Sequence, residues 1–224
     1  VVSEPEAQVA LHFRIANLHE TALELVGGAI EGYRDILAQW PGHEPSLAAL
    51  EGLIRTDREA VAATAVLEPV LKAAGAWERL IGAWRSLLEV TSEQDPRTAL
   101  RMQIGDAYEN MLADSDLAFD AYADAFREEP THEPALVSLE RVARNLGAFD
   151  RLVTLIEEQL GNVTADSTAR DLYLRVARIY EEELGSNVDA IERFRRVLEI
   201  EPDHDGAIHA LDRRNLLRDE VILV

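Results

Sequence analysis

The strongest constraint on the fold is one segment that the chain repeats three times. The copies run Leu11–His43, Leu100–His132 and Leu172–His204, and each consists of two apolar, helix-like stretches followed by Pro-x-His. Self-similarity at a fixed spacing over whole segments is typical of a helical-repeat array, in which neighbouring repeats bury one another. The chain is therefore expected to fold as a solenoid of stacked helix pairs.

The spacing of the three copies reveals an insertion. The second and third copies lie 72 residues apart, whereas the first and second lie 89 residues apart, a difference of 17. The 72-residue register returns later in the chain, because Leu67-Glu68-x-Val70 matches Leu139-Glu140-x-Val142. The extra residues are therefore expected to lie between about Leu53 and Leu67.

Apolar residues recur within each copy at the spacing of an α-helix. In the first copy the first helix-like stretch carries a stripe at positions i, i+4, i+7 and i+8. This stripe consists of Leu11, Ile15, Leu18 and His19, and the second stretch carries Ala29, Tyr33, Ile36 and Leu37. The small alanine allows two helices to approach closely, and the aromatic ring four residues later fills the groove beside it. Each copy thus predicts an antiparallel helix pair.

Each 72-residue unit divides again into two motifs of about 35 and 37 residues, because Leu139–Leu160 is a weaker version of the same helix pair. This period, with an alanine opening the second helix and a proline after it, resembles the tetratricopeptide repeat. The signature positions are Ala16, His19, Ala29, Tyr33, Ile36 and Pro41; Gly105, Tyr108, Ala118, Tyr122, Ala125 and Pro130; and Ala177, Tyr180, Ala190, Phe194, Val197 and Pro202. The departures are a longer turn between the helices and the absence of the early family tryptophan.

The resemblance implies an all-α fold, a right-handed superhelix of about 12 antiparallel helices in a single domain, 1–224. The expected helix pairs lie near 7–39, 44–91 with an inserted helix at 57–74, 96–128, 133–161 and 166–200, with a terminal helix at 204–217. Thr56 or Asp57 is expected to cap the inserted helix. Because the sequence begins at Val1 without a methionine, we expect a fragment of a longer chain.

Composition limits the classes of partner. The net charge is −20, from 22 basic and 42 acidic residues, and nucleic-acid binding needs clustered cations to neutralise phosphates. There is no apolar run long enough to cross a membrane and no signal segment, so we expect no nucleic-acid partner, no membrane insertion and a cytoplasmic location. A single lysine, Lys72, against 21 arginines indicates a GC-rich, bacterial coding bias.

The sequence offers no pattern for catalysis, a cofactor or a metal. There is no cysteine, and neither a P-loop nor a nucleophile motif is present. His43, His132 and His204 occupy one register of successive units, which places them tens of ångströms apart because packed helices are separated by about 8–10 Å. Zinc ligands must converge within about 2 Å of the ion. We therefore predict a role for these histidines in the turns, and no enzyme activity or cofactor.

Three glutamates are followed by a cation four residues later, the order that stabilises a helix surface. The expected pairs are Glu51–Arg55, Glu68–Lys72 and Glu140–Arg144.

In the family that the chain resembles, peptides lie in a concave groove lined by the first helix of each pair. The corresponding residues here are Phe13, Asn17 and Glu20; Met102, Asp106, Glu109 and Asn110; and Leu174, Arg178 and Glu181. Phe13, Met102 and Leu174 share one register and form either an apolar track for a partner or core between adjacent repeats.

Trp40 stands apart, because the matching residues in the other copies are Glu129 and Glu201. A position that accepts glutamate twice should face solvent. Trp40 therefore either packs against the inserted helix or contacts a partner protein, since tryptophan is enriched at binding hot spots.

These patterns predict a non-catalytic scaffold that binds a basic or amphipathic protein or peptide segment in an acidic groove. One alternative is a structural array that stacks on copies of itself or on neighbouring domains, which the apolar end Val221–Val224 favours. The other alternative is an accessory domain of a larger multidomain protein.

Overall fold

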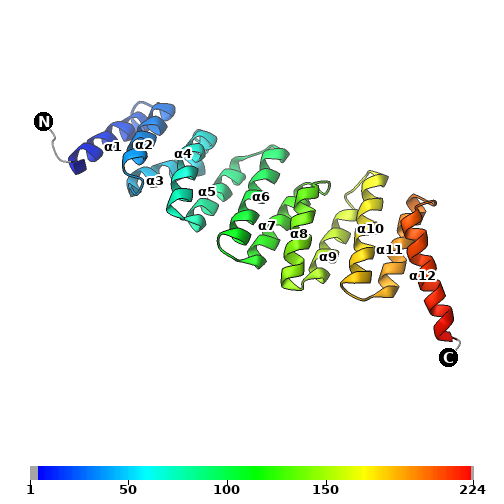
Figure 1. The fold of residues 1–224 in the computed structure, drawn as a ribbon. Coiled ribbons are helices and arrows are strands. Elements are labelled where there is room, and N and C mark those ends of the chain that lie inside the picture. Colours follow the sequence, from blue (N-terminus) through cyan, green and yellow to red (C-terminus); the bar gives the residue numbers. More distant parts are fainter. Residues whose placement is uncertain (1–4, 223–224) are drawn as a thin grey trace. The chain divides into compact units, whose positions relative to one another are not determined.

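The computed structural model describes residues 5–222, and the side chains of residues 6–213. The residues described form α-helices and no strand (Figure 1). The chain divides after Asp114 into two compact units. The first holds α1 (Pro5–Thr21), α2 (Val26–Gln39), α3 (Glu44–Arg55), α4 (Ala60–Ala74), α5 (Trp77–Val90) and α6 (Gln94–Asn110). The second holds α7 (Ser115–Glu128), α8 (Glu133–Leu146), α9 (Phe149–Leu160), α10 (Asp166–Glu182), α11 (Asn187–Ile200) and α12 (Asp205–Ile222).

The predicted all-α helical repeat of about 12 helices is confirmed. That residues 1–224 form a single domain stays a prediction. The side chains of the apolar end Val221–Val224 lie outside the described residues. No helix in the described part of the chain is both long and apolar enough to cross a membrane.

The residues that the repeat pattern predicts to be buried form the core of the three repeated helix pairs. The alanines that open the second helices, Ala29, Ala118 and Ala190, are fully buried, and so are the rings four residues later, Tyr33, Tyr122 and Phe194. Close approach is most stringent at Gly32, where a β-carbon would lie 2.8 Å from the β-carbon of Ala16.

The turn inside each repeated helix pair has one conformation in all three copies. A backbone N–H bonds to the carbonyl six residues earlier, which is one residue wider than the closing bond of a Schellman motif. These bonds join Leu25 to His19 (2.8 Å), Asp114 to Tyr108 (2.9 Å) and Ser186 to Tyr180 (2.8 Å). The residue before each donor is left-handed: Glu24 (φ 55°), Ala113 (φ 53°) and Gly185 (φ 65°). This wide closure accounts for the longer turn seen in the sequence.

The three histidines after Pro-x act as helix caps, which confirms their predicted role in the turns. The Nδ1 atom of each accepts a hydrogen bond from the N–H three residues later, which satisfies one of the free donors at a helix start. The bonds are Ser46 to His43 (3.3 Å), Ala135 to His132 (3.2 Å) and Ala207 to His204 (3.1 Å).

The insertion produces three consecutive helices, α3, α4 and α5, that pack against one another. The inserted helix α4 (Ala60–Ala74) lies near the expected 57–74, but neither Thr56 nor Asp57 caps it, so the expected cap was wrong. Thr56 instead closes the end of α3, its hydroxyl donating to the carbonyl of Gly52 (2.8 Å). Asp57 and Glu59 take left-handed conformations (φ 53° and 51°) in the turn that follows.

Because the insertion adds a single helix, it shifts the layer in which later helices of the first unit lie. α2 packs on α4 and α3 packs on α5, so alternate helices share a layer. In Figure 1, α4 and α6 lie toward the viewer and α5 lies behind them. α1 and α6 correspond in the repeat pattern but are separated by four helices instead of three. They therefore lie in opposite layers of the first unit.

Candidate partner-binding groove

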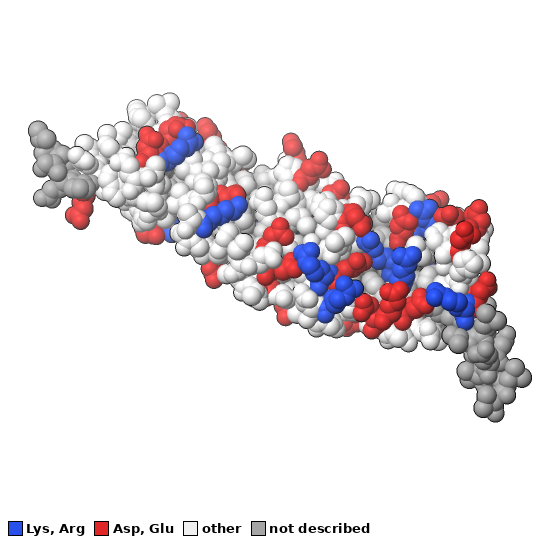
Figure 2. Space-filling view, viewed as in Figure 1, with Lys and Arg blue, Asp and Glu red and all other residues white. Residues whose placement is uncertain are grey.

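A groove of about 610 Å³ lies between α8 and α10 of the second unit. Beneath it lie Leu136 from α8 and Leu172 and Ile179 from α10, which are buried, and Leu174 of α10, which is half-buried. Carboxylates and guanidinium groups surround these residues, and Figure 2 shows basic and acidic side chains interleaved over the face that α8 and α10 form. An apolar lining beside fixed charges is the usual composition of a site that binds a ligand in a defined orientation.

One side of the groove is held by an arginine that bridges two glutamates, which we call the groove clamp. Glu133 and Glu140 lie two turns apart on the same face of α8. Arg175 of α10 contacts Glu133 through Nη2 and Oε1 (2.7 Å) and Glu140 through Nε and Oε1 (3.2 Å). The clamp joins α8 to α10 across the groove, and it directs both carboxylates toward α10.

Arg144 of α8 makes a second bridge across the groove. Its Nη2 lies 3.1 Å from Oε1 of Glu183, just after α10, and its guanidinium lies 5.8 Å from the ring centroid of Phe149. The expected Glu140–Arg144 pair within one helix was therefore wrong, because both residues bond to the neighbouring helix region instead.

The other two expected pairs have different outcomes. Glu68 and Lys72 form their ion pair (2.6 Å). Glu51 instead bonds to Arg79 of α5, so the expected pair with Arg55 was wrong.

The charges in the groove are predominantly negative. Five carboxylates line it against three guanidinium groups: Glu133, Glu140, Asp171, Glu182 and Glu183 against Arg144, Arg175 and Arg178. Burial raises the pKa of Glu140, and the neighbouring Glu133 adds to this, while Arg175 and Arg144 oppose it. Arg178 and Glu182 are exposed.

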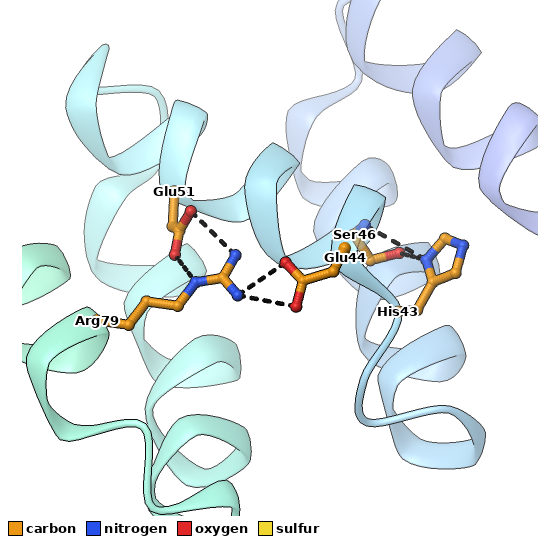
Figure 3. Close-up of polar contacts among 5 residues, drawn as sticks. All are labelled: His43, Glu44, Ser46, Glu51 and Arg79. Atoms are coloured by element: carbon orange, nitrogen blue, oxygen red, sulfur yellow. Dashed lines mark hydrogen bonds and ion pairs between the residues drawn. The ribbon is translucent and has the colours of Figure 1, made fainter.

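The first unit contains an equivalent of the groove clamp (Figure 3). His43 caps α3, and Arg79 of α5 bridges Glu44 (Nη1 to Oε2, 2.8 Å) and Glu51 of α3. We call this set the α3–α5 clamp. The clamp is thus a repeated device that joins two helices of one layer.

The third-copy residues predicted from the sequence lie partly in the groove. Leu174 and Arg178 line it. Leu174 also packs against the apolar cluster around Phe194. Glu181 is half-buried, with Arg213 of α12 3.9 Å away.

The first-copy residues pack inside the first unit. The ring centroid of Phe13 lies 5.8 Å from that of Tyr33 and 5.4 Å from that of His43. Glu20 accepts a hydrogen bond from the Tyr33 hydroxyl (2.7 Å), and Asn17 is half-buried. Burial, followed by the bond to Glu20, raises the pKa of Tyr33 far above its usual range.

The second-copy residues lie on α6. Met102 and Glu109 are half-buried, and Asp106 and Asn110 are exposed. Because α6 and α1 lie in opposite layers, their predicted residues do not follow one face of the first unit. Trp40 is half-buried at the end of α2, and its predicted contact stays a prediction.

The α8 side of the groove was missed in the sequence, because α8 belongs to a motif that retains only the apolar skeleton of the repeat. A signal was nevertheless present: Glu133 and Glu140 repeat the spacing of Glu44 and Glu51, each pair beginning directly after a capping histidine. Such a repeated spacing marks one helix face, but it does not reveal which arginine bridges the pair.

Comparisons with known proteins found similarity only among solved structures. No protein-family model matches the chain, and no curated protein matches it significantly. Among solved structures, MamA is 18% identical (87% of this chain, 92% of that chain, TM-score 0.37). YrrB, described as a tetratricopeptide-repeat protein with an unusual peptide-binding site, is 18% identical (90% of each chain, TM-score 0.39). A tetratricopeptide-repeat protein of Thermus thermophilus is 15% identical (91% and 97%, TM-score 0.32). The chain resembles tetratricopeptide-repeat proteins in being a helical repeat.

Proposed function

We propose that this chain is a non-catalytic scaffold that binds a segment of a partner protein in the groove between α8 and α10. The observation that carries the proposal is the groove itself, with apolar residues from two helices beside a fixed arginine–glutamate clamp. An apolar side chain of a ligand would pack against the half-buried Leu174, and the charged groups would orient the ligand.

The charge of the groove favours a basic, amphipathic segment. Five carboxylates face three guanidinium groups, and Glu182 is exposed. The raised pKa of Glu140 indicates that the nearby arginines do not fully offset the cost of burying its charge. A lysine or arginine of the ligand would add a favourable charge at this point, and the net charge of −20 would speed its approach.

The test compares three synthetic peptides of one length, a leucine–lysine, a leucine–glutamate and a glycine–serine peptide, by fluorescence anisotropy. The leucine–lysine peptide is expected to bind and to weaken as salt is added. Glu182→Arg should lower its affinity about 10-fold by placing a cation at the groove. Glu78→Arg, an exposed change of equal charge on α5 of the first unit, should leave binding intact.

Equal binding by wild type and Glu182→Arg would remove the groove as the site. Preference for the leucine–glutamate peptide would overturn the proposed charge of the partner. Circular dichroism of each variant would establish that its helices are retained.

A further inference from the structure

One face of α10 presents an apolar, a basic and an acidic side chain to the α8–α10 groove at equal intervals. Leu174, Arg178 and Glu182 are each four residues apart, so they follow one face of the helix. All three line the groove, and we call them the α10 row. The rise of an α-helix spaces them about 6 Å apart along its axis. The row therefore offers a ligand three different chemistries in a fixed order.

The basic member of the row is the groove cation best placed to receive a ligand carboxylate. The other two guanidinium groups of the groove already contact glutamates of the chain. Arg175 forms the groove clamp, at 2.7 Å and 3.2 Å from its two glutamates, and Arg144 lies 3.1 Å from Glu183. A ligand carboxylate that paired with either of them would compete with these glutamates. Arg178 is exposed on α10 beside them.

The acidic member of the row lies at the negative end of a helix dipole. Glu182 is the last residue of α10, and Glu181 and Glu183 flank it in the sequence. Arg144 lies 3.1 Å from Glu183. Arg213 lies 3.9 Å from Glu181, whereas Glu182 is exposed. Because the carbonyl groups at a helix end add to the negative potential there, a ligand cation is favoured at Glu182.

We propose that the groove selects a segment in which one acidic residue stands between an apolar residue and a basic residue. This selection rests on the proposed function, since it specifies which basic, amphipathic segment of a partner protein binds. The apolar side chain packs on Leu174, the acidic side chain pairs with Arg178, and the basic side chain pairs with Glu182. Alternate residues of an extended segment lie about 6–7 Å apart, which matches the spacing of the α10 row.

The test starts from the leucine–lysine peptide and a set of variants in which one lysine at a time is replaced by glutamate. Fluorescence anisotropy gives the Kd of each peptide for the wild-type chain. Glutamate near the middle of the peptide should raise the affinity about 3-fold, which is the size expected of an exposed ion pair. Glutamate at either end of the peptide should lower the affinity, because it removes positive charge without reaching Arg178.

Arg178→Glu should reverse this preference. The variant should bind the parent peptide at least as tightly as wild type does, which also shows that it is folded. It should bind the central-glutamate peptide about 10-fold more weakly than wild type does, because two carboxylates then face each other. The matched control is Arg195→Glu, at an exposed position of α11 outside the groove, and it should keep the wild-type preference.

The possible failures have different meanings. A wild-type chain that does not bind the parent peptide would overturn the proposed function and the selection together. A parent peptide that binds, with no gain from a central glutamate, would overturn the selection alone. A gain that persists in Arg178→Glu would also overturn it, because the glutamate would then contact another residue.

Discussion

The groove clamp and the α3–α5 clamp use the same residues to different ends. In both, a histidine caps a helix that begins with glutamate, a second glutamate follows seven residues later, and an arginine two helices further along bridges them. In the second unit the bridge borders a groove of about 610 Å³. The comparison shows that the clamp joins two helices in both units, whereas a further feature is needed to form a groove beside it.

The difference lies in where the arginine falls on its helix. Arg79 is the third residue of α5, which starts directly after the turn at Gly75 and Ala76. Arg175 is the tenth residue of α10, so two further turns of helix precede it.

These two turns supply much of one wall of the groove. With the two arginines taken as equivalent, Leu172 and Leu174 correspond to Ala76 and Glu78 in the first unit. In the same way, Arg178 corresponds to Gly82. The clamp thus fixes the distance between two helices, and the length of α10 supplies the groove wall.

The largest expected effect is on stability, from a substitution in the two further turns of α10 that supply much of the groove wall. Leu172→Ala should lower the free energy of unfolding by about 2–4 kcal/mol, because Leu172 is buried and its loss leaves a cavity. Urea denaturation with native-state hydrogen exchange over α10 would measure it. The control is Ala76→Gly at the equivalent place before α5, which should change stability by less than about 0.5 kcal/mol. A loss below about 1 kcal/mol in Leu172→Ala would mean that the wall is not tightly packed.

A smaller effect, equal in both regions, is expected from the clamps. Arg79→Ala and Arg175→Ala should each cost about 1 kcal/mol, because the arginines are similarly exposed (30% and 29%) and each leaves two glutamates unpaired. Chemical denaturation of the two variants side by side would measure this. A marked difference between the two costs would break the equivalence of the two clamps.

The smallest effect concerns the turns. Ala113→Gly should stabilise the first unit by about 0.5–1 kcal/mol, because Ala113 holds a left-handed conformation that glycine adopts freely, as Gly185 does in the second unit. Thermal denaturation would show a higher midpoint. Ala99→Gly, the same change at an exposed position inside α6, should instead destabilise by about 1 kcal/mol. A loss of stability in Ala113→Gly would show that the strain is absent.

Much of the fold could be predicted from local pattern. The helix pairs, the buried alanines and rings, and the capping histidines depend on spacing along one helix or one turn, which the sequence displays directly. The capping of α4 and two of the three surface ion pairs could not be predicted. They depend on a left-handed turn at Asp57 and Glu59, and on cations that approach from another helix.

The candidate groove was predictable only on its α10 side. Leu174 and Arg178 were identified through the family register, whereas Glu133, Glu140 and Arg144 of α8 were not. The sequence of α8 matches the repeat pattern only weakly, and nothing in its spacing shows that Arg175 of α10 lies opposite Glu133 and Glu140.

The sequence by itself determined that this chain is built of repeated helix pairs, because each copy of the repeat carries the same apolar positions to bury against its neighbours. The tertiary structure decided which helices share a layer and where a groove opens. A single added helix reverses the layer of every later helix in the first unit, and two added turns of α10 supply much of a groove wall. Both effects arise from distances between helices, which no periodicity along the chain encodes.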